Sequence, residues 1–146
     1  MNEPSRHYQI LEALDIQDFS VFSFDPSFTI SRGEIMQIID SAIKSPTSWR
    51  NQSWKFLILD DSRQKRKLVQ FLGNHLFVKD SSTIVVALVD QNSDIISNQF
   101  HDGVSEDDIL RCSPTTLIYF LLGCIVKGYD TWSLRSFQRG KINEVL

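Results

Sequence analysis

Between Thr115 and Lys127 the chain is apolar on nearly every side, with the run LIYFLLGCIV at its centre. Apolar residues on every face of a helix, rather than along one stripe, are typical of a helix that other elements surround. The longest apolar run, Leu117 to Val126, is too short to cross a bilayer, which takes about 20 residues. We therefore expect a central buried helix, closed by Gly128, in a fold that covers it on several sides.

The composition is that of one ordinary globular domain. The chain has 146 residues, of which 42% are hydrophobic and 23% charged, so we expect a single domain over residues 1–146 with residues 1–6 frayed. A net charge of −3 gives no electrostatic reason to bind nucleic acid or an acidic membrane. Cys112 and Cys124 do not make a disulfide framework, and the first twenty or so residues lack a secretory apolar run. These features predict a cytoplasmic protein.

Several common catalytic and metal-binding motifs are missing from the sequence. His7, His75 and His101 are scattered and no Cys/His ligand spacing occurs, so no metal site is predicted. The chain has no glycine-rich phosphate loop, nucleophile elbow or dinucleotide fingerprint. Cys124 lies inside the apolar helix and is expected to be inert.

Local patterns predict the other elements. Ser31 and Glu34 have the spacing of a capping box, and they open a helix whose apolar stripe, from Ile35 to Ile43, continues until Ser45-Pro46 ends it. Trp54–Leu59 reads as a strand, and Asp61 as the cap of a helix that stops at Gly73. Thr83–Val89 reads as a strand covered on both faces.

The order strand, helix, strand suggests a parallel α/β layer. Ser113 before Pro114 predicts the start of the buried helix, although Ser105–Asp108 could open a helix at Ile109. We expect Lys65-Arg66-Lys67 to lie in solvent. Tyr129 is either a proton donor or a tyrosine bonded to backbone.

Several segments together resemble the nitroreductase family of FMN-dependent oxidoreductases. Ser45–Trp54 is similar to the small-polar loop that leads from a helix into a strand and ends in Gln-Pro-Trp in that family. Phe24-Asp25-Pro26, Gly73–Phe77 and Gly128–Thr131 follow in the family's order. The resemblance runs from Asp18 to Leu146.

The resemblance implies a different architecture from the parallel layer. It implies an α+β nitroreductase-like sandwich, with a mostly antiparallel sheet flanked by helices and without the family's terminal strand. It implies FMN bound between the subunits of an obligate homodimer. It implies NAD(P)H as electron donor and a small-molecule acceptor of the nitroaromatic or quinone type.

The same resemblance supplies candidate cofactor-binding residues. Leu134 and Arg135 lie in the stretch whose backbone N–H groups face flavin N5 in the family. The other candidates are side chains in the N-terminal segment and the small-polar loop, namely Ser20, Thr47, Ser48, Arg50 and Asn51.

Other positions depart from the family's pattern and leave rival functions open. Asp18 and Phe22 stand where the family carries basic residues, and two like charges some 6 Å apart repel by roughly 3 kcal/mol at an effective dielectric of about 20. One hypothesis is an active flavin oxidoreductase. The second is a degenerate, non-catalytic binding protein of the same fold. A third is a partner-binding domain whose sheet edge accepts a strand.

Overall fold

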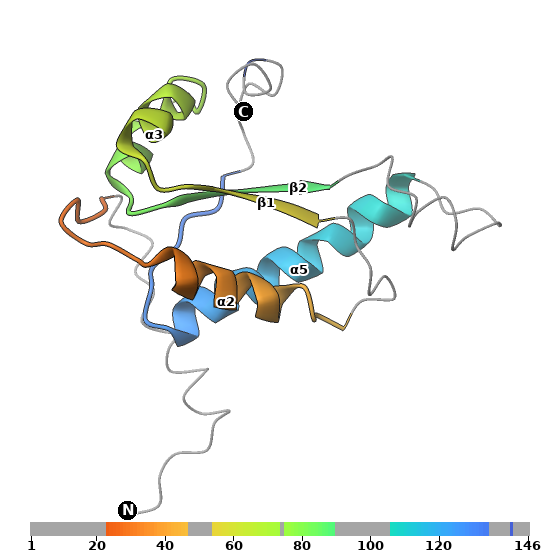
Figure 1. Cartoon of the computed structure of the whole chain (residues 1–146). Helices are drawn as coiled ribbons and strands as arrows, with labels where there is room; N and C mark the ends of the chain where they lie inside the picture. Colours follow the sequence, from red (N-terminus) through yellow and green to blue (C-terminus); the bar gives the residue numbers. More distant parts are fainter. Residues whose placement is uncertain (1–22, 47–53, 74, 90–105, 135–140, 142–146) are drawn as a thin grey trace, which may run out of the picture.

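The structure, a computed structural model, describes residues 23–46, 54–73, 75–89, 106–134 and 141, and for residues 89 and 106–113 it describes the backbone alone. Figure 1 shows a small sheet between helices. In chain order the elements are α2 (Arg32–Ala42), β1 (Trp54–Leu59), α3 (Ser62–Val69), the 3-10 helix η1 (Leu76–Asp80), β2 (Ile84–Val89) and α5 (Glu106–Val126). The predicted helix before Ser20, and the one expected to begin at Arg139, lie outside the described residues except for Lys141.

The two strands pair in antiparallel register. Trp54 stands opposite Val89, and Leu59 opposite Ile84. The chain therefore leaves β1 and enters β2 at the same end of the sheet, with α3 and η1 forming the reversal. Both predicted strands are confirmed, whereas the parallel arrangement suggested by their order is wrong. The α+β architecture implied by the resemblance is the one observed.

Alternate side chains of the strands enter two separate cores, because successive residues of a strand point to opposite faces. Figure 1 shows α2 and α5 side by side on one face of the sheet and α3 on the other. The core on the first face contains Ile35, Ile39, Phe56, Ile58, Val85 and Phe120. The core on the second face contains Leu57, Leu59, Leu68, Val69, Leu72, Phe77, Val78, Ile84, Val86 and Leu134.

Helix α2 begins where the sequence predicts. The Glu34 amide donates to Ser31 Oγ at 3.2 Å, and the Glu34 side chain accepts in return from the Ser31 amide and hydroxyl, which completes the capping box. The helix ends at Ala42, before the predicted stop. Ile43, whose spacing predicted a place in the buried stripe, is exposed because it lies beyond the last residue of α2.

Helix α5 departs from its prediction in two ways. It runs without interruption from Glu106 through Pro114, so the start predicted at Ser113 is wrong, and the earlier opening is the correct one. Proline at this position removes one helical hydrogen bond, a loss that the packing of α5 against α2 compensates. The helix is also not buried all round, since Ile118 is 54% and Val126 62% exposed.

The end of α5 is fixed by backbone geometry. Gly128 has φ +80°, a conformation that glycine adopts without steric cost. Its amide donates to the carbonyl of Ile125 at 2.8 Å, and the amide of Tyr129 donates to the carbonyl of Cys124 at 3.0 Å. These are the two hydrogen bonds of a Schellman motif. The predicted stop at Gly128 is confirmed.

Lys65 contradicts the expectation of a solvated basic run. The residue is 8% exposed, and its Nζ donates to the carbonyl oxygens of Ser81 and Ser82, whereas Arg66 and Lys67 are exposed. Ser82 Oγ in turn accepts from the amide of Ile30 at 2.8 Å. Lys65 thus connects α3 to the turn before β2, and the Ser82 hydroxyl connects that turn to the segment that enters α2. Within the described residues, every helix falls short of what a membrane span requires.

Candidate functional site

A cavity of about 830 Å³ is lined by residues of α2, α3, η1, β2 and α5 and of the segments 23–30 and 128–134. Its walls are mainly apolar. Ile35 and Ile38 come from α2, and Leu121 and Cys124 from α5, while Leu134 closes part of the remaining wall. A volume of this size is within the range of pockets that bind small molecules, roughly 300–1,000 Å³. The cavity is the candidate site.

The polar side chains of the described lining carry mainly hydroxyl groups and include no lysine or arginine. Among the described residues of the lining, the charged side chains are Asp25 and Asp130, both acidic and both exposed. Asp25 is already engaged, because its Oδ1 accepts from the amide of Ser27 at 2.8 Å and from the Ser27 hydroxyl at 2.6 Å. These hydrogen bonds to the charged form lower the pKa of the Asp25 carboxyl. The described lining is therefore mainly apolar, and its charged groups are two exposed carboxylates.

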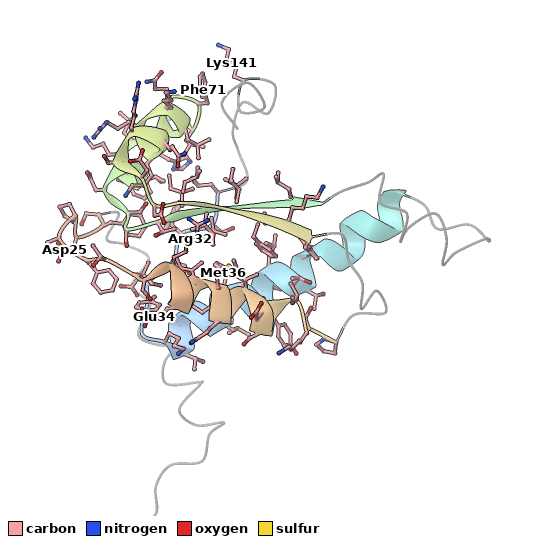
Figure 2. The ribbon with its side chains drawn as sticks, viewed as in Figure 1. Asp25, Arg32, Glu34, Met36, Phe71 and Lys141 are labelled. Carbon is pink, nitrogen blue, oxygen red and sulfur yellow. The ribbon has the colours of Figure 1, made fainter. Side chains whose placement is uncertain are left out.

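The segment 128–134 is attached to α2 at its first side chain. Tyr129 Oη donates to Glu34 Oε1 at 2.7 Å, and the ring of Tyr129 meets that of Phe28 at 5.8 Å between centroids. Figure 2 shows Glu34 at the start of α2, on the side where α5 ends. The predicted alternatives for Tyr129 missed this contact, since its partner is a carboxylate rather than backbone. Glu34, which the sequence explained completely as a cap, has this second role.

The bond between the two side chains favours one protonation state of each. Hydrogen bonds from Tyr129 and from Ser31 lower the pKa of the Glu34 carboxyl, and the positive charge of Lys127 acts in the same direction. The bond to Glu34 raises the pKa of the Tyr129 hydroxyl. The pair is therefore a neutral phenol donating to an ionised carboxylate, the stronger kind of hydrogen bond. Burial raises the pKa of the Cys124 thiol to about 11, in agreement with an inert cysteine.

The far end of the segment is held by packing. Trp132 meets Phe77 edge to face at 5.8 Å, and Leu134 is half-buried against the core on the α3 side. Leu134 is the predicted site residue that the structure describes, and it borders the cavity. The other six predicted site residues lie outside the described residues and stay predictions: Ser20, Thr47, Ser48, Arg50, Asn51 and Arg135.

The chain that leads into the predicted small-polar loop is anchored to α5. Ser45 is 3% and Thr116 1% exposed, and their hydroxyl oxygens are 3.0 Å apart. Buried hydroxyls at this distance share a hydrogen bond, which places the residue before Pro46 against the middle of α5. No local pattern predicted this pair, because its two residues are far apart in the chain.

The described cavity fits one part of FMN better than the other. Mainly apolar walls with hydroxyl groups among them suit an uncharged aromatic ring system. A phosphate dianion requires arginine, lysine or helix N-terminal amides, and the described lining offers two carboxylates instead. The described lining therefore supplies no cation for the phosphate, and Arg50, which lies outside the described residues, is the predicted candidate.

A sheet covered on both faces, with a mainly apolar cavity beside it, defines an α+β protein whose cavity has the size of a small-molecule pocket. The chain belongs to the nitroreductase family, whose family model matches residues 19–144.

Individual relatives agree with this assignment. The chain is 32% identical over 75 residues to YdgI of Bacillus subtilis, named as an NAD(P)H nitroreductase, a match that covers 51% of this chain and 36% of that protein. It is 31% identical over 150 residues to the protein DrgA of Synechocystis sp., covering 87% of this chain and 71% of DrgA. A nitroreductase from Exiguobacterium sibiricum, solved in complex with FMN, has a similar fold, with a TM-score of 0.77 at 20% identity over 99% of this chain and 81% of that chain.

Proposed function

We propose that this chain is a nitroreductase-type flavin oxidoreductase that passes electrons from NAD(P)H to a nitroaromatic or quinone-type acceptor. The observation that carries the proposal is the apolar cavity bordered by Leu134, the residue whose backbone N–H the family resemblance assigns to the flavin. Membership of the family supports an oxidoreductase, and the FMN-bound relative supports the choice of flavin. FMN, when bound, supplies the hydride chemistry, and the protein supplies binding and orientation.

Each part of the chain has a stated task in this proposal. The apolar walls from α2 and α5 exclude water from the ring and from the acceptor. Leu134 presents a backbone donor, a contact that does not depend on its side chain. Thr47, Ser48, Arg50 and Asn51 hold the flavin from the loop that Ser45 anchors, and Ser20 and Arg135 complete the set.

We also propose that the chain acts as a cytoplasmic homodimer. Helix α5 leaves Ile118, Tyr119 and Val126 exposed, and Met36 of the neighbouring α2 and Ile43, the residue that caps its end, are exposed as well. Large apolar side chains grouped on adjacent helices are typical of an interface rather than of a free surface. Ile118→Lys should therefore convert dimer to monomer in sedimentation, whereas Leu76→Lys, which charges an equally exposed apolar residue on η1, should leave the dimer intact. A monomeric unsubstituted chain would exclude the dimer.

Titration of the flavin-free chain with FMN tests the flavin itself. Binding should quench FMN fluorescence at a ratio near one FMN per chain. Asp18→Arg should tighten binding by at least about ten-fold, because it replaces a repulsive charge at the predicted phosphate position with an attractive one. Asp40→Arg, the same change at an exposed position on α2, is the matched control and should have little effect.

The second candidate function is a non-catalytic binding protein of the same fold. The absence of any lysine or arginine from the described cavity lining favours it. A chain that takes up no FMN, before and after Asp18→Arg, would establish this alternative and refute the oxidoreductase.

A further inference from the structure

Helix α2 and the segment after α5 are joined by a single carboxylate. Glu34 Oε2 accepts from the Ser31 amide at 3.3 Å and closes the helix cap, while Glu34 Oε1 accepts from Tyr129 Oη at 2.7 Å. One side chain therefore completes a local motif and also binds a residue 95 positions away in the chain. A capping box alone uses the first of these two oxygens, so the second contact needs its own explanation.

Tyr129 reaches this carboxylate from a defined starting point. The Schellman motif at Gly128 fixes the direction in which the chain leaves α5, and the amide of Tyr129 is part of that motif. Phe28 packs against the phenol ring from the segment that precedes α2. The backbone and the ring of Tyr129 are thus both held, and its hydroxyl is directed at Glu34.

The other end of the same segment has a separate attachment. Trp132 packs on Phe77, and Leu134 enters the core on the α3 side. Between the two attachments Asp130, Thr131 and Ser133 border the cavity. Loss of the Tyr129–Glu34 bond therefore weakens the attachment of the near half of this cavity wall, while the far half stays in place.

We propose that Glu34 and Tyr129 are positioning residues, which hold the segment 128–134 in the arrangement that receives the flavin. The inference rests on the proposed function, because the resemblance assigns a flavin contact to Leu134 in this segment. The pair acts through the position of the backbone and takes no part in electron transfer.

Two single variants and their combination test the pair. Tyr129→Phe removes the donor and keeps the ring that packs on Phe28. Glu34→Gln weakens the acceptor and keeps the cap, because glutamine serves at that position of a capping box. Asp40→Asn removes an exposed carboxylate from the same helix and is the matched control.

The first readout is amide hydrogen exchange of residues 129–134 in the flavin-free chain. A hydrogen bond to an ionised carboxylate that holds the segment in place should slow its exchange about ten-fold. Tyr129→Phe should therefore speed exchange by that factor, and Glu34→Gln, which keeps an acceptor oxygen, by a smaller factor. The double variant should equal Tyr129→Phe, because the bond already lacks its donor in that single variant. Unchanged exchange in Tyr129→Phe, or additive effects in the double variant, would overturn the proposal.

The second readout is the dissociation constant of FMN, with the visible circular dichroism of the bound flavin. Affinity should fall between two-fold and about ten-fold, the upper limit being reached when most chains have the segment displaced. Faster exchange with unchanged FMN affinity and dichroism would show a merely structural bond and refute the positioning role. Failure of the unsubstituted chain to bind FMN would refute the proposed function instead, and the exchange data would still decide whether the pair holds the segment.

Discussion

Gly123→Ala sets two opposing effects against each other at the contact between α2 and α5. Alanine in a helix interior is more favourable than glycine by roughly 1 kcal/mol. At this position, however, an added Cβ would lie 2.9 Å from Cγ2 of Ile38, closer than packed carbons approach. Ile38 is buried, and its β-branched side chain has little rotamer freedom with which to move aside. Overpacking of this kind costs about 1–3 kcal/mol.

The steric cost should exceed the propensity gain, so Gly123→Ala should lower the free energy of unfolding by about 1 kcal/mol in a urea titration. Gly33→Ala is the matched control, because its Cβ would meet nothing within 4 Å, and it should stabilise the chain by about 0.5 kcal/mol. Adding Ile38→Leu to Gly123→Ala removes the clashing methyl group and should recover part of the loss. Equal stabilisation by both alanines would refute the close approach of the two helices.

Three further predictions concern groups whose surroundings the structure defines. The folded-state pKa of the Glu34 carboxyl lies below its unfolded value. The group therefore stabilises the fold above the unfolded pKa and loses that contribution as the pH falls through the folded pKa. In urea titrations below about pH 5, the free energy of unfolding should decline less steeply with falling pH for Glu34→Gln than for the unsubstituted chain. Lys65→Met should cost about 2–3 kcal/mol in the same assay, because it removes two charge-assisted hydrogen bonds, whereas the exposed neighbour in Lys67→Met should change stability by less than about 0.5 kcal/mol. In a Cys112→Ser background, Cys124 should resist a thiol reagent at about pH 8 until urea unfolds the chain, since burial raises its pKa to about 11; rapid labelling of the folded chain would contradict its placement.

The sequence patterns correctly predicted those helix ends and that strand whose signals lie in neighbouring residues. The capping box at Ser31, the cap at Asp61 and the stop at Gly128 each depend on residues within one turn, and all three are present. The strand Trp54–Leu59 has the predicted bounds, because its composition and the acidic turn after it are sufficient signals. Pattern analysis therefore succeeds where the partner of each group is a close neighbour in sequence.

The errors concern contacts between residues that are far apart in the chain. Tyr129 and Lys65 each have partners from other elements, and nothing near them in sequence shows which carboxylate or carbonyl they meet. Pro114 did not begin the helix, because tertiary packing outweighs a single lost hydrogen bond. The all-apolar composition of α5 indicated complete burial, yet it does not distinguish burial within one chain from burial between two.

Sedimentation velocity of the chain loaded with FMN, detected at the flavin band near roughly 450 nm, tests the central claim of a flavin-binding dimer most directly. The flavin absorbance should sediment at the rate expected for a species of two chains, at a ratio near one FMN per chain. Flavin that stays behind while the protein sediments as a single chain would contradict both the cofactor and the assembly.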